Sequence, residues 1–406
     1  MTVSIDYASR QRAAIAACKE LGLDTVVVFA MGSCLGMNTA AQGYMSFLCG
    51  WDGIDSPSVL VLKDGRRPWL LVASHRMRMM ASENVYDADI EWGDITRYAT
   101  MIAATLTTDG DAGKGIGICG WDEMPAGLWT EIARVLQGRP RVEVGRTLAE
   151  LRRVKDGAQL ALHRKGADLC DRMFAGLAHM RVAGRFTCDI KAEMEMIARR
   201  QGVEYVGSWM TAGNNPDYSR YYPPENRQIA RAGEYLLAGV MLVTDGAWSH
   251  AVRSFHVGPV DARKRRIQDA VVDFQRCVVE SMVPGRDLAD VVREAYSRLD
   301  AIHDVIGTKD MRMLRLGHGL GCSYTEPVVS DPFPRSFHAL EHEAFRSHPV
   351  ILEPGMLFEI HPIFLFGGGG AAVGDMVLIE EGGGRFLTSF DRSLRELPSG
   401  PAHATG

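Results

Sequence analysis

The sequence predicts two domains, an α/β domain followed by an α+β domain. At 406 residues the chain exceeds what one hydrophobic core normally organises. In its first part, short apolar strands alternate with helical segments. The remainder combines long amphipathic helices with apolar strands suited to a curved antiparallel sheet. We place the two domains at residues 1–150 and 151–406.

The elements expected in the first domain follow from periodicity and turn residues. Helical periodicity covers residues 7–21, and the β-branched run at 24–30 is typical of a buried strand. Residues 58–73 predict two strands joined by the Asp64-Gly65 turn. The other expected elements are a helix at 95–106, a strand at 115–121, a helix at 124–136 and a short strand near Val142.

The second domain is predicted to pair helices with antiparallel strands. After a basic linker and a long first helix, a second helix has Thr187 as candidate N-cap and Gly202 just beyond its end. Pro284-Gly285 cannot continue a helix and separates the next two. The helices after the first are expected at 187–201, 263–282 and 287–302, and the strands at 234–243, 247–257, 357–366 and 375–380.

Composition and charge are those of a globular protein. Hydrophobic residues make up 46% and charged residues 23% of the chain, and the net charge of −5 gives no reason to expect nucleic acid or an anionic membrane as partner. The eight cysteines show no CxxC spacing, which suits reduced thiols. No signal peptide is evident, and no apolar run reaches the ~18 residues of a membrane span. We therefore expect a soluble, cytoplasmic protein.

Three stretches of sequence carry the candidate chemistry. They are DGAWSHAVRSF at 245–255, GHGLGCSYTEP at 317–327 and EPGMLFEIHPIF, which begins at Glu353. Together they resemble the active-site strands of the pita-bread superfamily, which contains creatinase, prolidase, aminopeptidase P and methionine aminopeptidase. The basic stretch in which Lys155 is followed by Gln159 resembles the linker of that family. The resemblance covers the whole chain, is closest in layout to creatinase, and implies a pita-bread fold for the second domain.

The resemblance also implies where metal ligands would lie. The family holds two ions with two Asp, one His and two Glu, and the matching positions here are Gly239, His250, His318, His361 and Gly374. The two glycines remove the ligands of one ion, while the three histidines surround the other. Imidazole binds transition-metal ions better than it binds hard ions. We therefore expect one divalent metal (Fe, Zn or Mn) bound by the three histidines.

The candidate catalytic residues are two tyrosines and a glutamate. Ungapped counting puts the catalytic histidine of the family at Tyr222, and one extra residue moves it to Tyr221. Either phenol is a candidate proton donor. Glu326 follows the glycine-rich turn and is the first candidate for a general acid or base.

The candidate substrate-binding residues are Arg253, Arg220, Thr325 and Glu359. The two guanidinium groups offer bidentate donors to a substrate carboxylate. Thr325 stands where the family has another histidine. His256 lies three residues beyond Arg253 on a strand, hence on the opposite face, and is expected to be a packing or surface residue.

These residues predict a creatinase/prolidase-family enzyme acting on a small polar, carboxylate-bearing molecule at a mononuclear three-histidine site. The reaction would be C–N hydrolysis or elimination, or an oxygen-dependent reaction if the ion is iron. The alternatives are a metal-free creatinase-like hydrolase and a non-enzymatic small-molecule-binding scaffold. With one ion and altered histidines, it should not be a standard dimetal peptidase or a creatinase. The resemblance to creatinase also implies a homodimer in which the polar loop at 31–46 helps to cover the active site of the partner.

Overall fold

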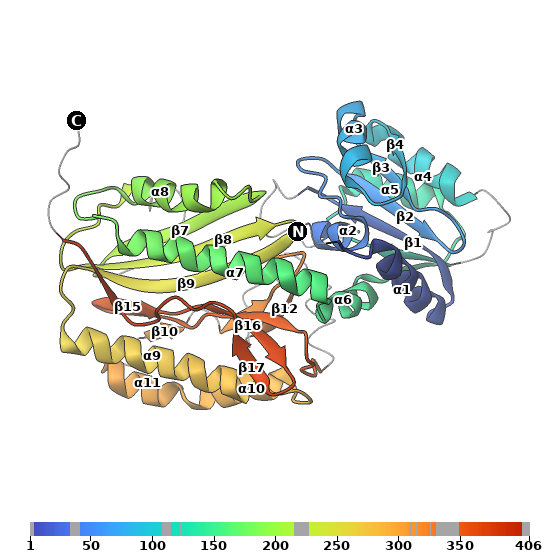
Figure 1. Ribbon diagram of the computed structural model, residues 1–406. Coiled ribbons are helices and arrows are strands. Elements are labelled where there is room, and N and C mark those ends of the chain that lie inside the picture. The colour runs from blue at the N-terminus through green and yellow to red at the C-terminus, as the bar shows by residue number, and fades with distance from the viewer. Residues whose placement is uncertain are drawn as a thin grey trace, which may run out of the picture. The chain divides into compact units, whose positions relative to one another are not determined.

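The computed structural model divides into two compact units, each with its own core (Figure 1). The first unit comprises Met1–Arg153 together with Gly321–Glu326. Among the described residues, the second comprises Val154–Leu320, 327–329 and 349–399. The structure describes residues 4–32, 41–107, 115–121, 123–214, 227–307, 311–313, 316–324, 326–329 and 349–399.

The first unit is an α/β fold in which helices cover both faces of a mixed sheet. Among the described residues this sheet has six strands, in the order β4 (Asp89–Trp92), β3 (Trp69–Val72), β2 (Ser58–Lys63), β1 (Leu23–Ala30), β5 (Gly115–Cys119) and β6 (Arg141–Glu143). Strand β1 pairs antiparallel with β2 and parallel with β5. The helices are α1 (Tyr7–Glu20), α2 (Ala41–Cys49), α3 (His75–Asn84), α4 (Tyr98–Thr107, after a 3-10 turn at Ile95–Arg97), α5 (Ala126–Val135) and α6 (Gly145–Arg153).

Both faces of β1 are buried, which explains its unbroken apolar run. Val26 and Val28 belong to a core that includes residues of α1 and α2, whereas Val27 and Phe29 belong to a core that includes residues of α4 and α5. Successive side chains of a strand point to opposite faces, so each core receives alternate residues. A strand covered on both sides therefore has no polar face.

The second unit is built on strands that are mostly antiparallel, with one parallel pair at an edge. In the part of the chain that the structure describes, these form a four-stranded, a five-stranded and a three-stranded sheet. The four-stranded sheet has the order β18 (Arg395–Leu397), β9 (Ala247–Val257), β8 (Tyr235–Thr244), β7 (Tyr205–Gly213). The five-stranded sheet has the order β12 (Glu326–Val329), β11 (Gly317–Gly319), β13 (Leu357–Ile360), β16 (Asp375–Glu380), β17 (Gly383–Phe386). The three-stranded sheet has the order β10 (Met311–Met313), β14 (Ile363–Phe366), β15 (Gly369–Ala372).

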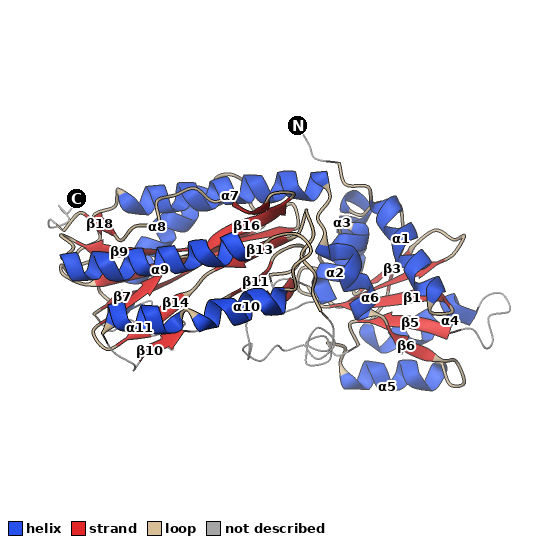
Figure 2. Ribbon diagram, turned by 90° about the horizontal axis from the view of Figure 1, so that it is seen from below, coloured by secondary structure: helices blue, strands red, loops and turns tan. Residues whose placement is uncertain are grey.

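Helices cover the sheets of the second unit from two sides. They are α7 (Gly157–Ala178), α8 (Thr187–Arg199), α9 (Ala262–Ser281), α10 (Leu288–Ser297) and α11 (Leu299–Ile306). Phe174 of α7 packs on Phe255 of β9, with ring centroids 6.2 Å apart. On the other side, Phe274 of α9 packs on Phe364 of β14 at 5.6 Å. Figure 1 shows these two helical layers with the strands between them, and Figure 2 shows α9, α10 and α11 lying over the strands. None of the helices in the described stretches is both long and apolar enough to cross a membrane.

Most expected elements occur close to their predicted positions, but two are divided. The helix expected at 287–302 is two helices, since Arg298, with φ −95° and ψ −1°, ends α10 and precedes α11. The strand expected at 357–366 is interrupted before Pro362, and β13 and β14 enter different sheets. Proline has no N–H to donate to a ladder, so the strand cannot continue regularly through this position.

Two local expectations are wrong. The loop expected at 31–46 is helical in its last part, because α2 buries Tyr44 and Leu48, four residues apart, in the core of the first unit. Thr187 is not the N-cap of α8: Phe186 occupies that position without a side-chain cap, and Thr187 is fully buried.

The N-terminus of α7 gives a first testable prediction. Asp156 accepts a hydrogen bond from Gln159 N at 2.8 Å, and the Gln159 side chain accepts one from Asp156 N at 3.3 Å, which completes a capping box. Asp156→Ala removes an acceptor for the first-turn N–H groups and should lower the free energy of unfolding by about 1 kcal/mol in urea. Asp168→Ala, on the exposed side of the same helix, should change it by less than about 0.5 kcal/mol. Equal effects of the two variants would contradict the capping assignment.

Candidate metal centre

Four buried side chains from three strands form a histidine–glutamate cluster, consisting of His250, His318, Glu359 and His361. His250 lies on β9, His318 on β11 and Glu359 on β13, and His361 follows β13 directly. His318 and Glu359 face each other in the register of β11 and β13. Glu359 and His361 are two residues apart, the spacing at which side chains of an extended chain share a face.

A backbone contact beside the cluster joins two sheets of the second unit. Val252 N donates to Gly374 O at 3.0 Å, and Gly374 N donates to Val252 O at 2.8 Å. Val252 is two residues from His250 on β9, and Gly374 directly precedes β16, the neighbour of β13. This bridge brings the histidine of one sheet to the glutamate of the other.

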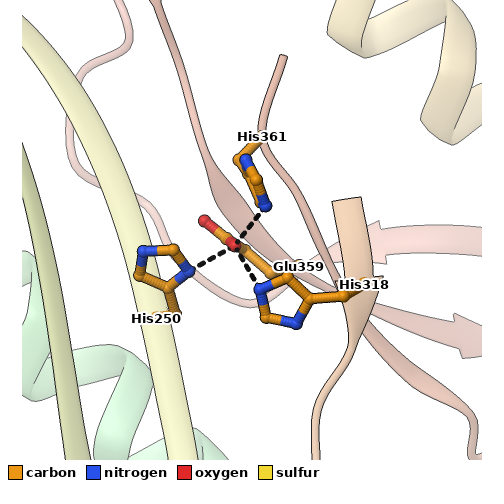
Figure 3. A group of neighbouring side chains, drawn as sticks. All are labelled: His250, His318, Glu359 and His361. Atoms are coloured by element: carbon orange, nitrogen blue, oxygen red, sulfur yellow. Dashed lines mark ion pairs between the residues drawn. The ribbon is translucent and has the colours of Figure 1, made fainter. Parts of the chain in front are cut away.

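The three imidazoles converge on one carboxylate oxygen (Figure 3). Glu359 Oε2 lies 3.2 Å from His318 Nε2 and 3.3 Å from His361 Nε2, and it also contacts His250 Nδ1. The candidate ligand atoms of the four residues all lie within 4.8 Å of one another. Each of the four residues is at most 1% exposed.

A hydrogen bond fixes the orientation of His318. Its Nδ1 lies 2.9 Å from the carbonyl oxygen of Gly319. A carbonyl can only accept, so Nδ1 carries the proton and Nε2 presents its lone pair to the cluster when the ring is neutral. This is the arrangement by which proteins commonly orient a metal-binding imidazole.

The two glycines that replace carboxylates in the resemblance have no room for a side chain. A Cβ atom on Gly239 would overlap the indole of Trp209, which lies opposite it on β7. A Cβ atom on Gly374 would lie 2.5 Å from Glu359 Oε1 and 2.8 Å from the Cβ atoms of His361 and Val252. Trp209 and Glu359 thus occupy the space beside these two positions.

The donor set of the cluster fits one transition-metal ion. Zinc, iron and manganese accept imidazole nitrogen and carboxylate oxygen, and the spacing of the donor atoms suits a shared ion. A buried carboxylate is stabilised when a cation lies beside it. The cluster is therefore a candidate metal centre, and ion binding by the three histidines stays a prediction.

Glu359, expected from the sequence among the substrate-binding residues, lies in the cluster. Its place could have been inferred from alternation along β13, because residues 359 and 361 share a face. A substrate-binding role for Glu359 stays a prediction.

Arg253 does not have the expected role of binding a substrate carboxylate. Its Nη2 donates to Asp375 Oδ1 at 2.7 Å and to Phe390 O at 2.8 Å, and its Nη1 donates to the carbonyls of Val252 and Gly374 at 2.8 and 2.6 Å. Its Nε–H bonds to the carbonyls of residues 390 and 391. Since all five donors have acceptors within the fold, this side chain is structural.

Glu326 forms a buried ion pair inside the first unit. Its carboxylate contacts Arg152 Nη2 and accepts a hydrogen bond from Ser323 N at 3.1 Å. Burial opposes the charged form of Arg152, but Glu326, Tyr44 and Cys322 together outweigh it and the pKa of the guanidinium is raised. The ion pair gives Glu326 a structural partner, and its expected role as a general acid or base stays a prediction.

Of the other residues considered for the site, the structure describes only His256. Tyr221, Tyr222, Arg220 and Thr325 lie outside the described residues. His256 is buried, and its ring nitrogens lie 3.0 Å from Gly258 O and 3.1 Å from Gly233 O, as expected of a packing residue.

The fold and the site define a class of protein: an α/β domain followed by a pita-bread domain with buried ligand-type side chains on its strands. The model of metallopeptidase family M24 matches residues 161–381, and the chain therefore belongs to that family. Membership of the pita-bread superfamily and the predicted fold class are thereby confirmed.

Individual relatives are distant in sequence. The chain is 23% identical to the probable dipeptidase PepE of Mycobacterium bovis, over 97% of each protein. It is 23% identical to the Xaa-Pro dipeptidase of Pyrococcus furiosus, over 61% of this chain and 66% of that protein. The crystal structure of a prolidase from Thermococcus sibiricus superposes with a TM-score of 0.78 at 20% identity, over 97% of this chain and 100% of that one. At such identity, the structural likeness supports the fold alone.

The buried carboxylate of Asp375 gives a prediction of pH dependence. Burial would raise its pKa, but Arg253 and Arg392 outweigh burial and hold the pKa below its usual range. Its contribution to stability is therefore fully present above about pH 4, the unfolded-state value, and is lost as pH falls through the folded-state pKa. Asp375→Asn should lower the free energy of unfolding by about 3–5 kcal/mol at pH 7, because Arg253 stays buried. In urea titrations between pH 3 and 7 the difference from wild type should shrink below pH 4, and a constant difference would contradict the assignment.

Proposed function

We propose that this chain is a metal-dependent enzyme that cleaves a C–N bond in a small polar substrate. Its cofactor is one divalent transition metal, iron, zinc or manganese, held by His250, His318 and His361. The observation that carries the proposal is the convergence of three buried imidazoles on one point. Relatives named as dipeptidases support a substrate with an amide-like C–N bond.

The packing of two glycines supports one ion and not two. Trp209 lies against Gly239, and the carboxylate of Glu359 lies against Gly374, so neither position accommodates a further ligand. A mononuclear centre differs from the two-metal arrangement that the family resemblance implies. For this reason we expect Xaa-Pro dipeptides to be poor substrates.

The residues of the cluster orient the metal-binding atoms and hold them in a buried environment. When bound, the ion supplies Lewis acidity, which polarises a carbonyl oxygen or lowers the pKa of a water molecule. The bond from His318 Nδ1 to Gly319 O keeps Nε2 directed into the cluster. Burial of all four side chains lowers the local dielectric constant and strengthens their interaction with charge.

A metal-free hydrolase is the second candidate. The contact between His250 Nδ1 and the Glu359 carboxylate favours it, since such a pair can hold a proton for acid–base catalysis. The two candidates differ in metal content and in the effect of chelators, which are harmless to a metal-free enzyme.

The proposal predicts that the three histidines act as one unit. Protein purified without chelator or metal-affinity tag should contain about one transition-metal ion per chain by elemental analysis. His250→Ala, His318→Ala and His361→Ala should each lower metal content and activity together, and a second replacement should add little because the site is already broken.

His256→Ala is the matched control, since it removes a buried histidine outside the cluster and should leave metal content unchanged. Two ions per chain would contradict the mononuclear centre. Full activity and unchanged metal content in His361→Ala would favour the metal-free hydrolase instead.

We further propose that the protein forms a homodimer and is located in the cytoplasm. The layout shared with creatinase supports the dimer. The cytoplasmic location is supported by the cysteines, since every cysteine in the described part of the chain is a free thiol, which suits a reducing compartment. Light scattering coupled to size exclusion should give the mass of two chains for the fraction that carries metal and activity. An active fraction with the mass of one chain would exclude the dimer as the functional form.

A further inference from the structure

We propose that Glu359 is a fourth protein ligand of the ion, and that Gly374 is a positioning residue that leaves space for its carboxylate. The inference rests on the proposed three-histidine centre and adds a ligand to it. It also narrows the class of metal that can support the reaction.

Two acceptor atoms face each other in the cluster. Since His318 Nδ1 donates to Gly319 O, the neutral ring turns the lone pair of Nε2 toward Glu359 Oε2, 3.2 Å away. Two acceptors that face each other at this distance repel unless a cation is bound at the same point. An ion at that point attracts both atoms, and the nitrogen of His361 lies 3.3 Å from the same oxygen.

Glu359 is fully buried, and its carboxylate faces the imidazoles of His250, His318 and His361. A positive charge at the same point stabilises a buried carboxylate further. Arg253 lies on the same strand as His250, but three residues away and hence on the opposite face, where it binds Asp375. A divalent ion between Glu359 and the imidazoles supplies the compensating charge.

Gly374 leaves space for two side chains of the cluster. A Cβ atom there would lie 2.5 Å from Glu359 Oε1 and 2.8 Å from His361 Cβ. Any other residue would displace either the carboxylate or the imidazole. Gly374 cannot move away, because its N–H and C=O are both bonded to Val252. Its lack of a side chain therefore positions two ligands at once.

The number of ligands bears on the choice of metal. Zinc in proteins is usually four-coordinate, and catalytic zinc sites commonly have three protein ligands and one open position. Four protein ligands would close a tetrahedral ion to substrate. An ion that accepts five or six ligands keeps positions open, and a mixture of imidazole and carboxylate suits Fe(II) or Mn(II). We therefore infer an Fe(II)- or Mn(II)-type centre.

Cobalt(II) titration of the metal-depleted full chain tests the fourth ligand, because the visible spectrum of this ion reports the number and kind of its ligands. Glu359→Gln keeps the size of the side chain and removes its charge, and should raise the Kd for cobalt at least about tenfold. Glu359→Ala and Gly374→Ala should weaken binding and shift the spectrum in the same direction. Glu380→Gln and Gly382→Ala are the matched controls on or beside β16, with an exposed carboxylate and an open glycine, and should behave as wild type.

The outcomes separate this inference from the proposed function. If both Glu359 variants keep wild-type affinity and spectrum while His361→Ala loses cobalt, the three-histidine centre stands and the fourth ligand is wrong. If His361→Ala binds cobalt as wild type does, the centre itself is wrong. Should Glu359→Ala fail to fold, as judged by circular dichroism, the isosteric Glu359→Gln decides.

Discussion

The centre of the second unit depends on one close approach of backbone, the bridge between Val252 and Gly374. It joins β9 of the four-stranded sheet to the chain entering β16 of the five-stranded sheet. A side chain at Gly374 would crowd this approach, because a Cβ atom there would lie 2.5 Å from Glu359 Oε1 and 2.8 Å from the Cβ atoms of His361 and Val252. Val252 also pairs with Gly239 on its other neighbour, β8. The candidate metal centre and the buried arginine network both lie beside this bridge.

Two carboxylates buried near the bridge have different kinds of partner. Asp375 receives Arg253, Arg392, Thr388 and Gln275, a set of donors that satisfies an ionised carboxylate permanently. Glu359 instead faces imidazoles, which are neutral near pH 7 when they bind metal. The first arrangement stabilises the fold. The second is the arrangement that we propose to bind a metal ion.

The chain combines the fold of family M24 with a different set of candidate ligands. A fold of this kind provides strands whose side chains converge, and the chemistry depends on which residues occupy those positions. Here imidazoles stand where the resemblance places carboxylates, and Trp209 fills the space next to a glycine. Such changes alter the number and the hardness of the ions that the same backbone can hold.

The sequence by itself determined the fold class, most elements and the set of three histidines. Apolar periodicity and turn residues are local properties, and the motifs around residues 250, 318 and 361 could be aligned without a structure. Tertiary structure decided the partners of the charged groups. Strand register and the packing of distant elements decide which charged groups meet. The resulting pairs are Glu359 with His250, Arg253 with Asp375, and Glu326 with Arg152. Alternation along a strand gives the face of a side chain, but its partner comes from a strand far away in the sequence, and no local pattern encodes that distance.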